Sequence, residues 1–402
     1  MTQARYHLQP AKTLLRGGSG VDPWFLGRYG MNLYRGCEHG CVYCDGRAER
    51  YYVAGDFERD VVVKENAMDL LTREFARCKE PGFVLLGGGV CDAYQPAERR
   101  FGLARGALGR VLDAGLPVHI LTKSRLVERD FEILDAIHQQ ATVVLSMSIQ
   151  TLDEDVRRKF EPRATPIRRR LETLRRAKAR GYWVGMMALP VLPGISDQPH
   201  AIDELTRAAV DVGADFMPGS ALTLRPGNQQ RTYLTVIERD YPALLPGYRA
   251  AYRAQRPSGI PAARYLTRVA ARFREAQERH GIPGRAPHAL FAGRMPEYAE
   301  VGVLLEHLAF ERGERWTDRP SLGLEAAGWE IQNWARKLVS RVHRKPGFTY
   351  RQVEGSFRSL CTSGDLVRVL PISEQVADEI IRLLAQVRAA RRQAAAANRA
   401  WR

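Results

Sequence analysis

The sequence has no hydrophobic run that could cross a membrane. Of its 402 residues 45% are apolar, yet no stretch of eighteen or more apolar residues occurs, and the first twenty residues contain no uninterrupted apolar segment of the kind a secretory signal needs. We therefore expect a cytoplasmic protein without membrane contact. Its apolar content is sufficient for one large core or for two domains.

Cysteine and lysine are both scarce. Six cysteines are too few for a disulfide scaffold, and three of them fall within residues 37–44, which favours metal ligation over cross-linking. Only eight lysines accompany 53 arginines. A lysine therefore marks a position where arginine was a poor substitute, because the two side chains differ in shape and in donor geometry.

Negative charge is in deficit, with 45 acidic against 61 basic residues and a net charge of +16. Such a balance suits a polyanionic partner such as DNA or another nucleic acid. GC-rich codon usage would also produce arginine-rich and alanine-rich tracts, so the charge leaves both explanations open. The stretch 333–352 mixes cations with aromatic rings, and it fits either a nucleic-acid surface or a solvated basic face over core aromatics.

Short apolar segments alternate with longer amphipathic ones between Gly30 and Leu224. The expected strands are Met31–Tyr34, Phe83–Leu86, Val118–Leu121, Val143–Ser148, Trp183–Leu189 and Phe216–Leu222. The expected helices include Asn66–Cys78, Glu98–Asp113, Glu128–Gln139, Pro166–Arg180 (with Thr165 as its N-cap) and Pro199–Val212. Strands that are apolar throughout are typical of a parallel sheet covered by helices.

Six such βα units predict an α/β fold of the (β/α)6 partial TIM barrel type, with the site at the C-terminal ends of the strands. A doubly wound sheet is the alternative, but no G-x-G-x-x-G opens a helix here. After Tyr248 we expect helices over 262–280, 299–310 and 323–344, then a loop or short-strand stretch, then a last helix from Ser373. The predicted domains are an N-terminal arm (1–29), the barrel (30–248) and a mainly helical C-terminal extension (249–402).

The segment after the first expected strand carries the clearest chemical signal. In NLYRGCEHGCVYCDGR (32–47), Cys37, Cys41 and Cys44 have C-x3-C-x2-C spacing. Three thiolates this close can each bind one iron of a cubane cluster and leave the fourth iron open for chemistry on a bound ligand. A zinc site with His39 as the fourth ligand is the alternative, but His39 lies too close in sequence to Cys37 and Cys41 for tetrahedral chelation by all four.

This spacing, the aromatic Tyr43 before the last cysteine and the βα framework resemble the radical S-adenosylmethionine (SAM) superfamily over about residues 30–225. The resemblance implies a [4Fe-4S] cluster on the three cysteines and SAM bound to the open iron. It also implies reductive cleavage of SAM to methionine and a 5′-deoxyadenosyl radical, with the electron supplied by a flavodoxin- or ferredoxin-like donor.

Further segments are similar to the spore photoproduct lyase-like branch with its YQP-x-E motif. They are VKENAMDLL (63–71), DAYQPAERR (92–100), LTKSRLVERD (121–130), SMSIQTLDEDVRRKFEPRA (146–164) and ALPVLPGISD (188–197). The type member of that group reverses a thymine dimer in DNA, so the resemblance implies a lyase-like, DNA-repair type of activity on nucleic acid. A radical SAM enzyme that modifies a peptide or small metabolite is the alternative. A cluster-bearing binding protein without turnover is a third.

The resemblance assigns several cofactor contacts, each with a structural alternative. Gly87, Gly88 and Gly89 match the motif that binds the SAM amino group, although Val90 and Cys91 stand where that motif carries an acidic residue; a strand-ending bulge is the alternative. Lys123 is assigned to the SAM carboxylate, and an ordinary exposed lysine is the alternative. The remaining assignments are Tyr43 beside the cluster, Ser146 and Ser148 at the ribose or carboxylate (or as core serines), and Leu192 against the adenine.

Two candidate catalytic residues follow the glycines in the sequence. In photoproduct lyases a cysteine in the corresponding segment returns a hydrogen atom to the product radical, which assigns that role to Cys91; a buried hydrophobic cysteine is the alternative. Tyr94 either relays the radical or packs the pocket wall. Glu161 and Arg163 are expected to support the pocket, and Cys78 and Cys361 to be structural.

Overall fold

The computed structural model describes residues 4–17, 20–53, 55–78, 80–88, 90–313, 323–342 and 349–400. By its internal contacts the chain forms two compact units. Unit 1 comprises residues 1–14, 31–74 and 86–286, and unit 2 comprises 15–30, 75–85 and 287–402. Among the described helices, none combines the length and the apolar character that crossing a bilayer requires.

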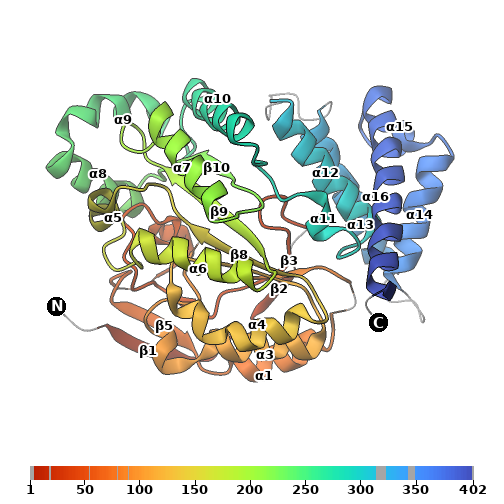
Figure 1. Ribbon diagram of the computed structural model, residues 1–402, viewed down its shortest axis with the longest axis horizontal. Helices are drawn as coiled ribbons and strands as arrows, with labels where there is room; N and C mark the ends of the chain where they lie inside the picture. Colours follow the sequence, from red (N-terminus) through yellow and green to blue (C-terminus); the bar gives the residue numbers. More distant parts are fainter. Residues whose placement is uncertain are drawn as a thin grey trace. The chain divides into compact units, whose positions relative to one another are not determined.

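A parallel sheet forms the core of unit 1 (Figure 1). Its strands lie in the order β7 (Val118–Thr122), β8 (Val143–Ser148), β9 (Trp183–Val191) and β10 (Gly219–Ala221). Val118 lies opposite Val143, and Ser148 lies opposite Met187. All six residues of β8 are buried, as expected for a strand covered on both faces.

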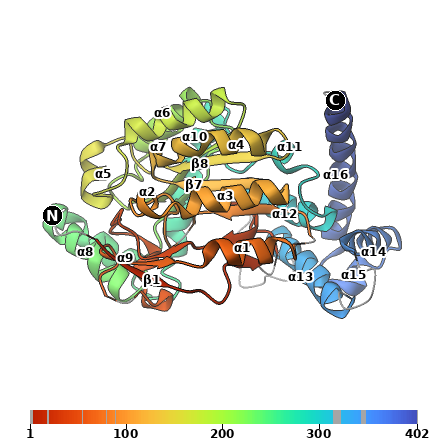
Figure 2. The ribbon, with the colours of Figure 1, turned by 90° about the horizontal axis from the view of Figure 1, so that it is seen from below.

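Helices cover this sheet. Figure 2 shows a row formed by α1 (Ala67–Phe75), α3 (Leu103–Ala114), α4 (Phe131–His138) and α6 (Ile167–Ala179). Helix α3 buries Ala104, Leu108 and Val111, a spacing of three and four residues that places one apolar face toward the sheet. Two further helices, α7 (Pro199–Asp211) and α10 (Ala263–His280), pack against each other.

A second, small sheet leads the chain into the cysteine segment. Strand β5 (Asp60–Lys64) pairs in parallel with β1 (Arg5–Gln9) and antiparallel with β4 (Tyr34–Arg35). Gly36 follows at φ +80°, and a Cβ there would lie 2.7 Å from the carbonyl oxygen of Asp60. Only glycine fits this turn without strain, so the small sheet fixes where the cysteine loop begins.

The other helices of unit 1 are short or follow the last strand. They are α2 (Glu98–Phe101), α5 (Glu154–Phe160), α8 (Asn228–Asp240) and α9 (Leu245–Ala251). Helix α5 begins at an N-cap, because the Asp153 carboxylate accepts hydrogen bonds from the amides of Asp155 and Val156.

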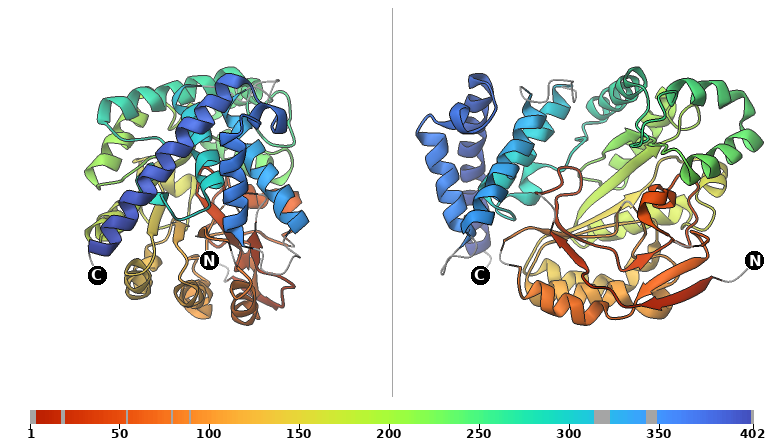
Figure 3. Two further views of the ribbon diagram at one scale, coloured as in Figure 1. Left: turned by 90° about the vertical axis from the view of Figure 1, so that its right-hand side faces the viewer. Right: turned by 180° about the vertical axis from the view of Figure 1, so that it is seen from behind.

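Unit 2 is mainly helical. It contains the strands β2 (Leu15–Gly17), β3 (Gly27–Met31) and most of β6 (Phe83–Leu86), and the helices α11 (His288–Phe291), α12 (Glu297–Glu311), α13 (Leu324–Val342), α14 (Tyr350–Thr362), α15 (Leu366–Val369) and α16 (Glu374–Ala400). Figure 3 shows α12, α13, α14 and α16 as a bundle. The buried Glu300 ties it together by pairing with Arg391 and His288.

The strand predictions at Phe83–Leu86 and Val143–Ser148 are confirmed, and two others need correction. The expected strand Met31–Tyr34 is divided, because β3 ends at Met31 and Tyr34 pairs instead with Val63 of β5. The expected strand Phe216–Leu222 keeps only Gly219–Ala221. Proline at position 218 has no N–H to donate, which interrupts the ladder there.

Three helix predictions also change. Gly102, at φ +62°, divides the expected helix Glu98–Asp113 into α2 and α3. Thr165 does not cap α6: its Oγ1 accepts a hydrogen bond from the amide of Arg125, and Pro166 is the N-cap residue. The loop or short-strand stretch expected after residue 344 is wrong, since α14 begins behind a capping box of Thr349 and Gln352.

Candidate functional site

The three cysteines of the loop lie in the interior of unit 1. Cys37 and Cys41 are buried and Cys44 is half-buried. The loop is held by its own backbone, since the amide of Cys37 donates to the Phe57 carbonyl at 2.9 Å and that of Cys44 to the Cys41 carbonyl at 3.3 Å. The buried guanidinium of Arg47 donates to the Cys41 carbonyl at 2.8 Å and to Gly40 at 3.0 Å. The loop is therefore held by contacts of the protein itself.

The surroundings of the thiols suit a strongly positive ligand. Burial, together with the neighbouring thiols, raises the pKa of Cys37 well above its usual value and raises the pKa values of Cys41 and Cys44. Lys123 opposes this effect at Cys41 and Cys44. Metal ligation requires thiolates. Forming three thiolates in these surroundings requires more positive charge than the ammonium of Lys123 supplies, and the irons of an iron–sulfur cluster would supply it.

His39 contacts a carboxylate rather than the thiols. Its Nε2 lies 3.1 Å from Oδ2 of the half-buried Asp92. A metal-bound histidine makes the same kind of contact with its other ring nitrogen, so the argument against the zinc alternative, in which His39 would be a fourth ligand, rests on the sequence spacing. Within the described ranges no three His, Cys, Asp or Glu side chains gather as ligands of one ion; a cubane cluster instead takes each thiolate on a different iron.

Asp92 is a functional residue that sequence reasoning missed. Its carboxylate accepts hydrogen bonds from the Thr122 hydroxyl at 2.8 Å and from the Lys123 amide at 2.7 Å. Burial alone would raise its pKa, but His39 and these amides outweigh burial and lower the pKa of Asp92 to about 2. A permanently ionised Asp92 thus connects the cysteine loop to the end of β7. In the sequence, the position of Asp92 next to Cys91 was the signal that could have indicated it.

The glycine turn lies at the end of β6. A Cβ on Gly87, at φ +89°, would lie 2.2 Å from the Leu121 carbonyl oxygen, so no side chain fits there. Gly88 has φ +152° and forms an isolated bridge with Cys91, while Gly89 lies outside the described residues. A Cβ on Gly46 would come within 2.4 Å of the Val90 carbonyl oxygen. The turn therefore packs directly on the end of the cysteine loop.

Cys91 is buried beside this loop. Its thiol donates to the Tyr34 carbonyl, with the sulfur 3.2 Å from the oxygen. Burial raises the pKa of Cys91 to about 12, with smaller contributions from Asp92 and Cys44. The thiol therefore keeps its proton at neutral pH.

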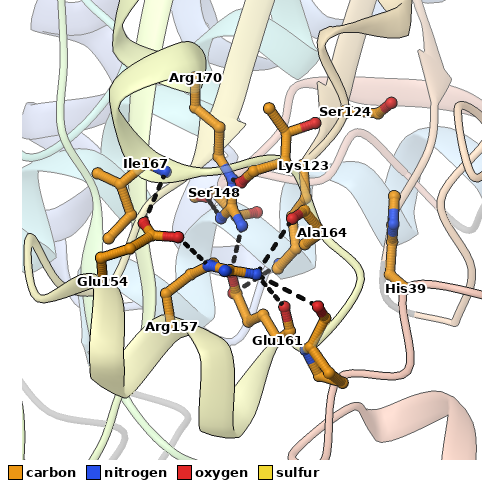
Figure 4. Close-up of polar contacts among 12 residues, drawn as sticks. His39, Lys123, Ser124, Ser148, Glu154, Arg157, Glu161, Ala164, Ile167 and Arg170 are labelled. Carbon is orange, nitrogen blue, oxygen red and sulfur yellow. Dashed lines mark hydrogen bonds and ion pairs between the residues drawn. The ribbon is translucent and has the colours of Figure 1, made fainter.

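Lys123 directly follows β7 and lies at the edge of a buried ionic group (Figure 4). Its Nζ lies 3.9 Å from Oε1 of Glu161 and 5.7 Å from the centre of the Tyr43 ring. The Tyr43 hydroxyl and Arg170 both donate to Glu161, which is fully buried. Burial alone would raise the pKa of Glu161, but Arg170 and Lys123 outweigh it and lower that pKa.

This ionic group is assembled from three elements. Arg170 of α6 also donates to the carbonyl of Ser148, at the end of β8, at 2.8 Å. Arg157 of α5 donates to the Glu161 carbonyl at 2.9 Å (Figure 4). Arg163, which we expected in this pocket, instead pairs with Glu58 at 2.7 Å and is half-exposed. No sequence signal distinguished Arg170 among 53 arginines.

The two strand serines differ in their surroundings. The Ser146 hydroxyl lies 2.7 Å from Nε2 of the buried His119, which favours the core-serine alternative. Ser148 lies at the end of β8, where its carbonyl meets Arg170. Leu192 is fully buried and belongs to the same apolar cluster as Cys41 and Tyr43, so the segment after β9 packs directly on the cysteine loop.

Tyr94 is fully buried near two carboxylates. Burial and then the charges of Asp130 and Glu98 raise its pKa well above the usual value, so its hydroxyl faces carboxylates from α2 and the segment before α4. This position favours packing over a radical relay.

Helix α8 braces the far end of the cysteine loop, which sequence reasoning did not predict. The buried Gln229 donates from Nε2 to the Tyr43 carbonyl at 2.8 Å and to Asp45 at 3.0 Å. Asp45 also accepts from the Thr223 hydroxyl at 3.0 Å and pairs with Arg225 at 3.2 Å. The chain that follows β10 therefore helps to fix Cys44.

Comparison with known proteins agrees with this arrangement. The family profile described as the radical SAM superfamily matches residues 31–205. The chain belongs to the radical SAM superfamily. An uncharacterised protein of Mycobacterium tuberculosis is 31% identical over 272 residues, which are 65% of this chain and 79% of that protein. An uncharacterised protein of Methanocaldococcus jannaschii is 28% identical over 216 residues, 54% of this chain and 77% of its own.

The fold is that of spore photoproduct lyase. A structure of that enzyme complexed with dinucleoside spore photoproduct superposes with a TM-score of 0.51 at 18% sequence identity, and covers 69% of this chain and 80% of its own. A further structure of it, with bound AdoMet and the same dinucleoside, gives the same TM-score, identity and coverage. The predicted α/β radical SAM fold with a helical C-terminal part is confirmed.

Proposed function

We propose that this protein is a radical SAM enzyme that acts on nucleic acid with lyase-like chemistry. The observation that carries the proposal is that the buried Cys37 and Cys41 and the half-buried Cys44 share one loop near Lys123. When bound there, a reduced [4Fe-4S] cluster supplies the electron that cleaves SAM to methionine and a 5′-deoxyadenosyl radical. A flavodoxin- or ferredoxin-like protein is the proposed electron donor, in an anaerobic or reducing cytoplasm.

The residues around the thiols suit the parts of SAM. The resemblance to the superfamily assigns the glycine turn at Gly87 to the amino group of SAM, and Lys123 offers an ammonium for the carboxylate. The Glu161 carboxylate lies 3.9 Å from that ammonium. Arg170 lowers the pKa of Glu161 and so keeps it ionised. Leu192, in the apolar cluster of the cysteine loop, is the residue we assign to the adenine. Ser148, at the end of β8, is assigned to the ribose or the carboxylate.

Lys123→Ala should weaken SAM binding by about 1.5–3 kcal/mol, the range for a hydrogen bond to a charged group. The cluster should still assemble, because its ligands lie on another loop. Equilibrium binding of SAM to the reconstituted protein measures the effect, and Lys12→Ala, which removes an exposed lysine, is the matched control. Unchanged SAM affinity in Lys123→Ala would exclude Lys123 from the cofactor site.

Cys91→Ala should change the product and not the cofactors. Once a hydrogen atom has been taken from the substrate, a carbon radical remains. We assign its quenching to hydrogen-atom transfer from the protonated Cys91 thiol, which leaves a thiyl radical that the proposed electron donor reduces with uptake of a proton. The variant should bind cluster and SAM normally and still form 5′-deoxyadenosine, while mass spectrometry of the substrate shows trapped or adduct species. Cys78→Ala is the control. A normal product formed at the normal rate in Cys91→Ala would leave Cys91 with packing alone.

Two features support nucleic acid as the substrate class: the net charge of +16 and the fold shared with an enzyme solved with a dinucleoside photoproduct. The test is turnover with deuterium-labelled, ultraviolet-irradiated DNA. Deuterium in the 5′-deoxyadenosine supports the proposal. Abundant 5′-deoxyadenosine that acquires no deuterium from DNA or RNA would favour the alternative, a radical SAM enzyme acting on a peptide or small metabolite.

A further inference from the structure

A second concave site lies in unit 1, outside the residues discussed above. It is a cavity of about 560 Å³ between the segment that follows β9 and the helices α9 and α10. Neither the cysteines nor Lys123 line it. Its size falls within the range of ligand sites in proteins, and it is far too small to admit a nucleic-acid duplex.

One face of α10 supplies the charge of this cavity. Arg264, Arg268 and Arg272 all line it and are spaced four residues apart. Residues with this spacing lie on the same side of a helix, and successive guanidinium-bearing positions are about 6 Å apart along the axis at 1.5 Å per residue. The separation resembles that of neighbouring phosphates in an extended strand, and arginine forks match phosphate oxygens.

The acidic residue of the cavity neutralises only one of these arginines. Asp197 is buried, and its carbonyl accepts from Arg272 at 2.5 Å while its Oδ2 lies 3.8 Å from the same guanidinium. The Tyr265 hydroxyl also donates to Asp197, at 2.8 Å. In the part of the chain that the structure describes, no carboxylate pairs with Arg264 or Arg268. Arg268 is held 5.2 Å from the centre of the Tyr265 ring.

One residue of the cavity wall belongs to the apolar cluster that includes part of the cysteine loop. Tyr248 lines the cavity and donates to the Pro193 carbonyl at 2.8 Å. The same tyrosine belongs to the apolar cluster that contains Cys41 and Leu192. This apolar cluster therefore connects the wall of the cavity to the loop where we propose cofactor chemistry.

We propose that this cavity is a binding site for the phosphodiester backbone of single-stranded nucleic acid, with Arg264 and Arg268 as the phosphate-binding residues. This inference rests on the proposed function and adds to it the way in which the substrate strand is held. Two arginines that line a nucleotide-sized cavity, are spaced along one helix and have no carboxylate partner among the described residues fit successive phosphates better than one small anion. Arg272, held by Asp197, is a positioning residue of the cavity wall.

The test is fluorescence anisotropy of labelled oligothymidylate with the reconstituted full chain at several salt concentrations. Arg264→Gln/Arg268→Gln should weaken binding about tenfold at low salt and lower the slope of log affinity against log salt by about 1.4, because each phosphate contact contributes about 0.7 for single strands. Arg175→Gln/Arg274→Gln removes the same charge from two positions that do not line the cavity, on α6 and on another face of α10, and it should bind like the wild type.

Equal affinity and slope in the wild type and the Arg264→Gln/Arg268→Gln variant would overturn the cavity proposal and leave the proposed function standing. Displacement of the strand by inorganic tripolyphosphate at an equal phosphate concentration would overturn it in favour of a free anion, and absence of any binding by the wild type would overturn it outright. Binding lost in the variant, together with 5′-deoxyadenosine that acquires no deuterium from labelled strands, would support the cavity and refute the proposed substrate.

Discussion

Cys41→Ala should abolish the reductive cleavage of SAM. With one of three thiolates removed, two sulfur ligands remain for a cluster that needs three. Without the cluster, Cys37 and Cys44 should stay protonated, because burial raises the pKa of both thiols. The fold should survive, because the loop is held mainly by backbone contacts and by Arg47. We expect no 5′-deoxyadenosine above background by liquid chromatography after reduction with dithionite.

The controls for this variant are simple. Cys78→Ala, which removes a half-buried thiol outside the loop, should keep the iron content and the cleavage rate of the wild type. Circular dichroism should show equal helix content in all three proteins. Retained cleavage in Cys41→Ala would contradict the assignment of the cluster to this loop.

Arg170→Met should destabilise the fold by about 3–5 kcal/mol at pH 7, the range for removing one partner of a buried ion pair. Arg170 and Glu161 are both fully inaccessible to solvent, so the variant leaves a buried carboxylate whose nearest remaining cation is Lys123, at 3.9 Å. Urea denaturation measures the loss. The double variant Glu161→Gln/Arg170→Met removes both charges and should recover part of it.

This loss should depend on pH in a defined direction. The ion pair lowers the pKa of Glu161 in the folded protein, so its contribution is present above the pKa of the unfolded carboxyl and declines as the pH falls toward the folded value. The difference in the free energy of unfolding between the wild type and Arg170→Met should therefore become smaller as the pH falls. Arg168→Met, on the same helix but 85% exposed, should change stability by less than about 1 kcal/mol at any pH. An equal effect of the two variants would show that the buried pair is not a major source of stability.

Local patterns were sufficient for the central strands and for the cysteine loop. Val143–Ser148 is apolar or small throughout, and such a segment has few stable positions other than the middle of a covered sheet. The C-x3-C-x2-C spacing keeps three thiols close together along one short loop, so it can be recognised without tertiary information. Position 102 shows the limit, because one glycine within an otherwise helical pattern leaves open whether the helix continues or breaks.

The partners of the site residues could not be predicted, because they depend on long-range packing. Asp92 meets His39, 53 residues away, and Lys123, 31 residues away. Gln229 reaches the Tyr43 carbonyl across 186 residues. The Ser146 hydroxyl is engaged by His119, a partner that only the register of β7 against β8 brings near. The row of arginines on α10 carried no signal in a chain with so many arginines.

The most direct test of the central claim is electron paramagnetic resonance of the anaerobically reconstituted and reduced protein, before and after SAM is added. If three cysteines hold a cubane with one open iron, the protein should contain about four irons, and the signal should change when SAM occupies that position. The same change should be weaker in Lys123→Ala at equal SAM concentration. A protein that holds no iron cluster, or a cluster signal that SAM leaves unchanged, would contradict the account.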